Sequence, residues 1–154
     1  MTTVIGIDPG LTGAVAVIEP DGSYAVWDLS VMPVGTGKGR VKNKINGAAL
    51  AAVLRDATDC QGLAKVEKVA AMPGQGVAGM LSLGHSAGVI EGVLAALGIP
   101  FEMVTPQKWK KAAGLIGSEK DASRTKAQQL FPAASLSRKK DIGRADALLI
   151  AKYG

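Results

Sequence analysis

The chain has very little of two residue types that metal sites and covalent catalysis often use. Its 154 residues include one cysteine, Cys60, and one histidine, His85. A single cysteine excludes an internal disulfide bond and fits a reducing compartment. We interpret Cys60 as a small residue at the end of a helix rather than as a nucleophile. A single histidine excludes a multi-histidine zinc site.

Long apolar runs and export signals are also missing. The longest apolar stretch, residues 88–99, is interrupted by Glu91 and is shorter than the roughly 20 residues that cross a bilayer as a helix. No basic and apolar leader opens the chain, so we expect a protein that is not exported and needs no membrane. With 47% hydrophobic and 20% charged residues, the chain is expected to fold as one domain over residues 1–154.

Positive charge is concentrated in two segments, although the net charge is only +5. Residues 36–44 carry +4 and residues 105–144 carry +7, which leaves −6 for the remainder. An acidic centre with basic flanks suits a polyanionic substrate, whereas scattered surface lysines are the simpler alternative. Residues 35–42 are rich in glycine but lack the spacing of a nucleotide-binding loop. We interpret them as a flexible arm that contacts a DNA backbone.

The order of apolar and polar segments predicts an α/β domain. Strands are expected at residues 3–8, 13–19, 23–29, 65–71 and 100–104, with turn signals that make the first three antiparallel neighbours. Helices are expected at 47–58, 79–97, from 105, at about 118–130 and at 143–152. This order predicts a mixed five-stranded sheet flanked by helices. Helix 79–97 is rich in glycine and alanine, which would permit close approach of a second subunit.

Three carboxylates lie in or beside apolar segments. Asp8 ends the first strand, Glu67 interrupts the fourth, and Asp146 opens the last helix. Together they would raise one another's pKa values unless cations neutralised them. Mg²⁺ prefers oxygen ligands, and two such ions can clamp the attacking and leaving oxygens of a phosphodiester. The pattern predicts a metal-dependent nuclease, although Glu67 could also be a solvated strand residue and Asp146 a charge favoured by the helix dipole.

Five segments have an order and spacing that are specific in combination. They are Ile5-Gly6-Ile7-Asp8-Pro9-Gly10-Leu11-Thr12-Gly13, the Glu67 strand, Met72-Pro73-Gly74-Gln75-Gly76, Thr105-Pro106-Gln107-Lys108-Trp109-Lys110, and Gly143-Arg144-Ala145-Asp146-Ala147-Leu148-Leu149-Ile150-Ala151. In these segments the chain resembles the RuvC-type Holliday junction resolvases, in particular their phage branch. The resemblance implies an RNase H-like fold and a homodimer.

The same resemblance implies a Mg²⁺-dependent crossover junction endodeoxyribonuclease, which resolves four-way DNA junctions by paired symmetric nicks. Two Mg²⁺ ions would bind in each active site, and Mn²⁺ could substitute. The partner would be branched DNA, and the location would be the cytoplasm of a bacterial or phage-infected bacterial cell.

The resemblance also assigns roles to individual residues. Asp8, Glu67 and Asp146 become metal ligands and catalytic residues. Lys110 and Lys120 match lysines near the scissile phosphate that could stabilise the developing charge, although both could be ordinary surface lysines. Trp109 is interpreted as a core anchor of the basic helix, and His85 as a packing or DNA-contacting residue. The residues expected to bind DNA are Lys38, Arg40, Lys42, Lys44, Lys108, Lys111, Arg124 and Arg144.

The chain departs from the family pattern at two places. Bacterial relatives have a fourth acid where this chain has Gly143, and Asp141 is the nearest acid that could serve as the fourth ligand. Relatives also have an aromatic residue after the Glu strand that stacks on an unpaired base. Residues 80–83 contain no aromatic, so Met80 or Leu81 could form an apolar wedge, but a buried helix face is the favoured interpretation.

Two alternative functions follow from these departures and from the first motif. A non-catalytic junction-binding protein would explain the missing acid at Gly143. An ATP-binding protein of the actin and sugar-kinase type would use residues 8–13 to contact phosphates, but that class normally needs a second similar lobe, which 154 residues cannot supply.

Overall fold

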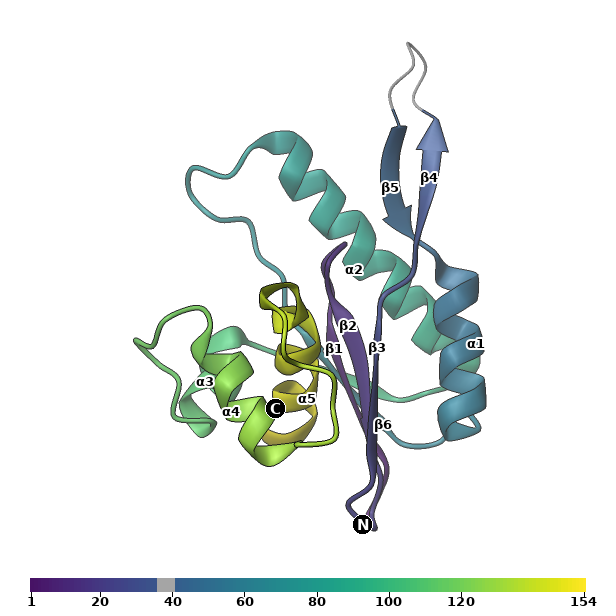
Figure 1. The fold of residues 1–154 in the computed structure, drawn as a ribbon. Helices are drawn as coiled ribbons and strands as arrows, with labels where there is room; N and C mark the ends of the chain where they lie inside the picture. The colour runs from purple at the N-terminus through teal and green to yellow at the C-terminus, as the bar shows by residue number, and fades with distance from the viewer. Residues whose placement is uncertain (36–40) are drawn as a thin grey trace.

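The predicted mixed sheet is present in a computed structural model that describes residues 1–35 and 41–154 (Figure 1). The sheet has the order β3-β2-β1-β6-β7. β1 pairs antiparallel with β2 and parallel with β6, β2 pairs antiparallel with β3, and β6 pairs parallel with β7. Its strands are β1 (Val4–Asp8), β2 (Ala14–Ile18), β3 (Tyr24–Asp28), β6 (Leu63–Glu67) and β7 (Phe101–Val104).

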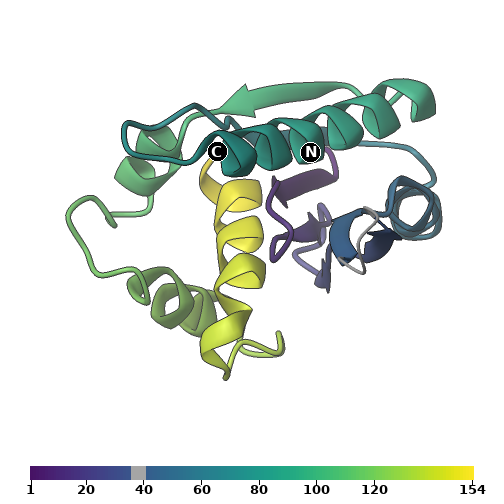
Figure 2. The same cartoon turned by 90° about the horizontal axis from the view of Figure 1, so that it is seen from above.

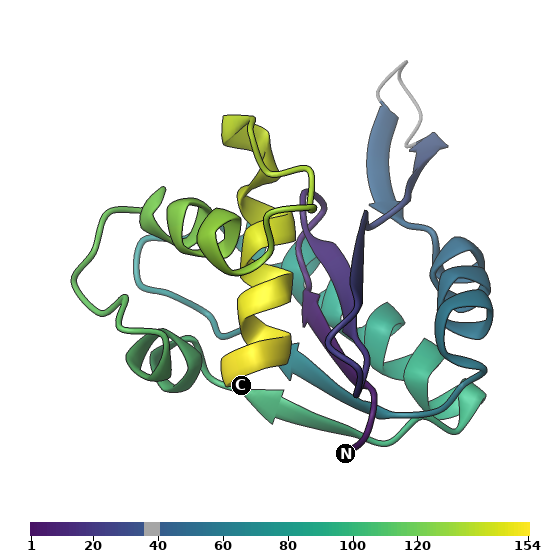
Figure 3. The same cartoon turned by 60° about the horizontal axis from the view of Figure 1, so that its bottom comes forward.

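Helices cover both faces of this sheet, as Figures 1 and 3 show. One face packs against α1 (Gly47–Thr58) and α2 (Val77–Leu97). The other packs against α3 (Pro106–Ala112), α4 (Ala122–Leu130) and α5 (Ile142–Tyr153). Alternation along the strands sorts the side chains, because successive residues point to opposite faces. Val15 and Val17 of β2 join the first core, and Ala14 and Ala16 join the second.

Glycines allow α5 to lie unusually close to β1 and the turn that follows it. A Cβ added to Gly6 would overlap the carbonyl oxygen of Ala147 in α5. A Cβ added to Gly143 would overlap the carbonyl oxygen of Thr12. Figure 2 shows α5 lying alongside the first strands, between them and α3 and α4. This packing places Asp146 next to the end of β1, and it leaves no room for a larger residue at position 143.

A β-hairpin replaces much of the predicted flexible arm. β4 (Val31–Gly35) and β5 (Val41–Ile45) pair antiparallel, with Val31 opposite Ile45. Ile45 is buried at the base of the hairpin, and the hairpin extends away from the main sheet (Figure 1). The prediction of a loop was therefore wrong for residues 35, 41 and 42, because the pairing of β4 with β5 is a tertiary feature that glycine content does not show. Lys38 and Arg40 lie outside the described residues.

α2 is longer than the apolar stretch considered in the sequence. Its 21 residues are long and apolar enough to cross a membrane by length and composition, with a mean hydropathy of 1.4 over a window of which 22% is buried. The prediction that no apolar stretch is long enough to cross a bilayer was therefore wrong, because the apolar helix extends beyond residues 88–99. Length and composition alone are weak evidence for a membrane span. The low burial does show that much of α2 is uncovered in a single chain.

Candidate active site

Two of the three carboxylates lie side by side at one edge of the sheet. Asp8 is the last residue of β1 and Glu67 is the last residue of β6. These strands are parallel, and Ile7 is opposite Val66, so the next residue on each strand is one of the two acids. The sequence predicted that Glu67 interrupts a strand over 65–71. In the structure the strand ends at Glu67, and its carboxylate therefore reaches the same edge as that of Asp8.

The third carboxylate, Asp146, approaches from α5, and the charges of neighbouring acids contribute to raising the pKa values of Asp8 and Asp146. Burial, followed by the charges of Asp146 and Glu67, raises the pKa of Asp8 to about 7. Burial is also the largest cause that raises the pKa of Asp146 to about 6, and the charge of Glu67 adds to it. Burial raises the pKa of Glu67 as well. The three carboxylates thus share one desolvated site, where burial outweighs the positive charge of Lys110.

The residues of this site fit a divalent cation. Oδ1 of Asp146 is buried and accepts no hydrogen bond. The nearby hydroxyl of Ser123 lowers the pKa of Asp146, although its oxygen is itself buried without a hydrogen-bond partner. Within residues 1–35 and 41–154, no group of three or more His, Cys, Asp or Glu side chains is spaced to hold an ion. Small side-chain movements would therefore have to accompany binding, and they would satisfy the unpaired oxygen.

Two lysines predicted to be catalytic act on these carboxylates. The charge of Lys110 lowers the pKa values of Asp8, Glu67 and Asp146. The charge of Lys120 lowers only that of Asp146. Lys110 is therefore close enough to act on all three carboxylates, whereas Lys120 acts only on Asp146 in α5. Neither lysine forms an ion pair with an acid among the described residues.

The indole of Trp109 contacts the site directly, which sequence reasoning missed. Trp109 is fully buried in the core beneath α3, as predicted for a core anchor. Its Nε1 also donates a hydrogen bond of 2.7 Å to Oε2 of Glu67. A buried indole N–H usually finds an acceptor, so the sequence did signal a partner. It could not identify one that lies 42 residues away.

A cleft of about 430 Å³ opens beside the carboxylates. Asp8 and Glu67 line it together with Pro9, Met72, Leu83 and Thr105, among others. The preferred interpretation of residues 80–83 as a buried helix face was wrong for Leu81, which is 74% exposed. Leu81 and His85 line a different cavity, between α2 and β5. An apolar wedge at Leu81 stays a prediction.

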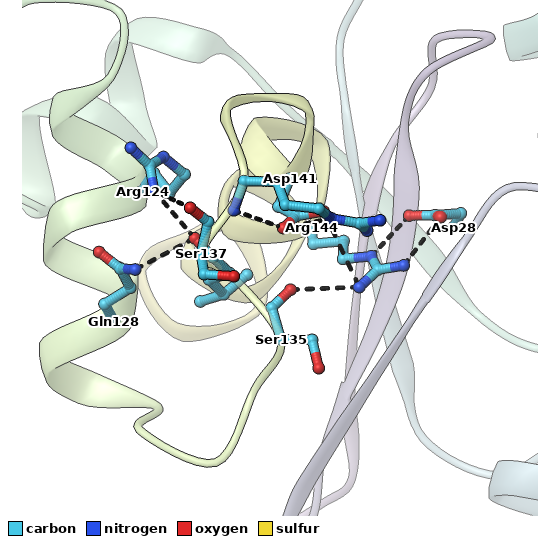
Figure 4. A network of polar contacts seen from close by, with 9 residues as sticks. Asp28, Arg124, Gln128, Ser135, Ser137, Asp141 and Arg144 are labelled. Carbon is cyan, nitrogen blue, oxygen red and sulfur yellow. Dashed lines mark hydrogen bonds and ion pairs between the residues drawn. The ribbon is translucent and has the colours of Figure 1, made fainter.

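The structure separates Asp141 from the three carboxylates. Asp141 is 2% exposed and caps the 3-10 helix η1 (Lys139–Asp141), where it accepts hydrogen bonds from the backbone and guanidinium of Arg138. These bonds, led by that of the Arg138 side chain, lower its pKa. Nη1 of Arg144 lies 3.9 Å from Oδ1 of Asp141. Figure 4 shows both side chains. The prediction that Asp141 replaces the missing fourth acid is therefore not supported, because two arginines already neutralise it.

Two arginines predicted to bind DNA instead hold the segment before α5 in place (Figure 4). Arg144 donates two hydrogen bonds to Asp28 on β3 and a third to the carbonyl oxygen of Ser135. Arg124 donates two to Asp121 and others to the carbonyl oxygens of Leu136 and Ser137. The structure thus engages these guanidinium donors within the chain, and contact of either arginine with DNA stays a prediction.

Exposed lysines flank the turn that follows Asp8. Lys42 and Lys44 line a cavity with Leu11, and Lys140 lines a hollow with Leu11 and Thr12 on the other side. Lys139 and Lys140 are exposed residues that the sequence analysis did not select. The sequence feature that could have identified them is the basic run Arg138-Lys139-Lys140. Lys108 and Lys111 are exposed on α3.

Comparison with known proteins relates this geometry to one class of nuclease. No protein-family model matches the chain. The chain is 35% identical over 149 residues to the chloroplastic Holliday junction resolvase MOC1 of Chlamydomonas reinhardtii, and the match covers 83% of this chain. It covers only 17% of that protein.

Solved structures with a similar fold include two of Thermus thermophilus RuvC. The first has a TM-score of 0.57 at 20% identity, and the second, in complex with a Holliday junction substrate, has 0.60 at 16%. Both matches cover 97% of this chain and 90% of the RuvC chain. The yeast mitochondrial Holliday junction resolvase Ydc2 has a TM-score of 0.56 at 16% identity, covering 96% of this chain and 75% of its own.

The fold is thus the RNase H-like fold of RuvC, with a mixed five-stranded sheet between helices. Within that class, the chain is similar over 83% of its length to the Holliday junction resolvase MOC1. The predicted resemblance and fold class are confirmed.

Proposed function

We propose that the chain is a divalent-metal-dependent endonuclease that resolves four-way DNA junctions by a nick in each of two strands. The observation that carries the proposal is the shared burial of Asp8, Glu67 and Asp146 at one end of an RNase H-like sheet, with raised pKa values. Similarity to the resolvase MOC1, and to RuvC in complex with a Holliday junction substrate, supports the choice of substrate.

The chemistry divides between a bound cation and the residues of the chain. Mg²⁺ or Mn²⁺, two ions per site on the family pattern, would supply Lewis acidity toward the attacking and leaving oxygens of the phosphodiester. Asp8, Glu67 and Asp146 would hold the cation, since oxygen ligands suit hard divalent ions. Lys110 would place a compact positive charge where negative charge develops on the phosphate, and Lys120 would assist from the α5 side.

Cleavage of defined DNA structures tests the proposal. Purified protein is incubated with end-labelled four-way junctions, forks, flaps and linear duplex in Mg²⁺, Mn²⁺ or EDTA. The proposal predicts paired nicks in the junction that require the metal, with linear duplex left intact. Tight junction binding without any nicking would instead favour a non-catalytic junction-binding protein. The lack of a fourth acid at Gly143 motivates that second candidate.

The lysines on either side of the turn after Asp8 are proposed to contact DNA phosphates. We expect Lys139→Gln/Lys140→Gln to weaken junction binding. The slope of the logarithm of the association constant against the logarithm of the salt concentration should become shallower by up to about two, one for each lost phosphate contact. Lys42→Gln/Lys44→Gln should behave in the same way. Fluorescence anisotropy across a salt series measures both. Lys152→Gln, at the far end of α5, is the control and should leave the slope unchanged.

The uncovered face of α2 is proposed to form a homodimer. Gly84, Gly88 and Gly92 recur every four residues, and a Cβ added at any of them would meet nothing in its own chain. Gly88→Arg should therefore leave the monomer folded but separate the subunits. Light scattering should give about twice 15.7 kDa for the wild type and a monomer for the variant. Ala52→Arg, at an exposed position of α1, is the control. A monomeric wild type would refute the dimer.

Two further expectations stay predictions. They are the presence of two ions per site and a cytoplasmic location.

A further inference from the structure

One buried side chain contacts both an acid and a base of the candidate active site. Trp109 donates a hydrogen bond to Glu67 through Nε1, and Nζ of Lys110 lies 5.5 Å from the centre of its ring. We propose that Trp109 is a positioning residue that fixes Glu67 for metal binding and holds Lys110 beside the carboxylates. This inference rests on the proposed function, because Glu67 is taken to be a metal ligand.

The hydrogen bond restricts Glu67 in a way that ordinary packing would not. An indole N–H can only donate, so Oε2 of Glu67 is the acceptor, and a bond of this kind favours the ionised carboxylate. The 2.7 Å distance is that of a charge-assisted bond. With one oxygen engaged, the carboxylate has one orientation and its second oxygen is available to a cation. Hydrogen-bond partners of metal ligands usually affect the affinity for the metal as well as the orientation of the ligand.

The backbone around Trp109 forms a closed path that makes this orientation rigid. Glu67 pairs with Val104 at the end of β7. The next residue, Thr105, caps α3 by accepting a hydrogen bond from the amide of Lys108. Trp109 then lies one turn along α3 with no solvent exposure, and its indole returns to Glu67. A movement of α3 would therefore disturb the acid and Lys110 together.

The second tryptophan of the chain provides a matched control. Trp27 lies on β3 and is partly buried against the core on the other face of the sheet. It lines a different cavity, beside Asp28 and Arg144. Trp27→Phe makes the same change of side chain at a partly buried position, without touching the carboxylates.

Direct metal binding separates a positioning role from a structural one. Mn²⁺ affinity is measured by electron paramagnetic resonance for the wild type, Trp109→Phe and Trp27→Phe, and junction affinity is measured in EDTA. We expect Trp109→Phe to bind Mn²⁺ about 10- to 100-fold more weakly, with junction affinity unchanged in EDTA. Nicking should be partly restored by excess Mn²⁺. Trp27→Phe should bind Mn²⁺ like the wild type.

A second replacement keeps the test decisive if Trp109→Phe folds poorly. Benzothienylalanine at position 109 has the shape of tryptophan but no N–H, so it removes the hydrogen bond and keeps the volume. The same loss of Mn²⁺ affinity is expected. Unchanged Mn²⁺ affinity in this protein would overturn the positioning role, even if the wild type nicks junctions. A wild type that neither binds Mn²⁺ nor nicks junctions would overturn the proposed function itself.

Discussion

Asp8→Asn should abolish junction nicking while leaving junction binding intact. Asp8 is the most strongly perturbed carboxylate of the site, with its pKa raised to about 7 by burial and by the charges of Asp146 and Glu67. The amide is almost the same size but carries no charge to hold a divalent ion, so the chemistry should lose a factor on the order of 10³ or more. The lysines proposed to bind DNA lie outside the site, so junction affinity should change less than about twofold.

Single-turnover nicking and anisotropy of the same labelled junction measure the two quantities. Asp56→Asn, an exposed acid on α1 across the sheet, is the matched control and should nick at the wild-type rate. A nicking rate for Asp8→Asn within a few-fold of the wild type would contradict the assignment. Equal loss of binding and nicking would show instead that Asp8 supports the fold.

The same substitution should stabilise the protein in the absence of metal. The pKa of Asp8 is raised from 3.8 in the unfolded chain to about 7 in the fold, so the folded state holds the proton more tightly. Its contribution to stability is present below about pH 4 and is lost as the pH rises through about 7. Each pKa unit corresponds to about 1.4 kcal/mol. We therefore expect Asp8→Asn to gain about 2 to 4 kcal/mol at pH 8 in EDTA.

Urea unfolding at several pH values measures this difference. The gain should shrink to almost nothing at about pH 3 and below, where Asp8 is protonated in both the folded and the unfolded state. Mg²⁺ at pH 8 should stabilise the wild type more than the variant, because a ligand of the folded state adds to its stability. A variant less stable than the wild type at pH 8 would show that the ionised carboxylate is already compensated.

Local sequence patterns were enough to predict the fold and the position of the site. The five strands of the main sheet and the antiparallel pairing of the first three followed from short apolar segments and turn signals. The three acids were selected because carboxylates in apolar segments are costly. Glycine-rich composition misled the analysis at residues 35 and 41–42, where the β-branched residues of β4 and β5 form a hairpin. Pairing between strands depends on contacts between separate segments, so the composition of one segment does not predict it.

The remaining differences concern charged groups whose partners only the packing identifies. Arg144 was expected to bind DNA, but its partner Asp28 is 116 residues away. Asp141 was expected to bind metal, but Arg138 engages both of its oxygens. The missing acid at Gly143 also has a structural reason, since a side chain there would overlap the turn after β1. The sequence shows which groups are charged, but only the packing shows which charges are free.

Crystals grown with Mn²⁺ would test the central claim most directly, because the anomalous signal locates the ion without any assay of activity. We predict an anomalous peak coordinated by Asp8, Glu67 and Asp146, with Oδ1 of Asp146 among the ligands. Ordered Mn²⁺ elsewhere, with these carboxylates still unliganded, would contradict the assignment of a metal-dependent nuclease site.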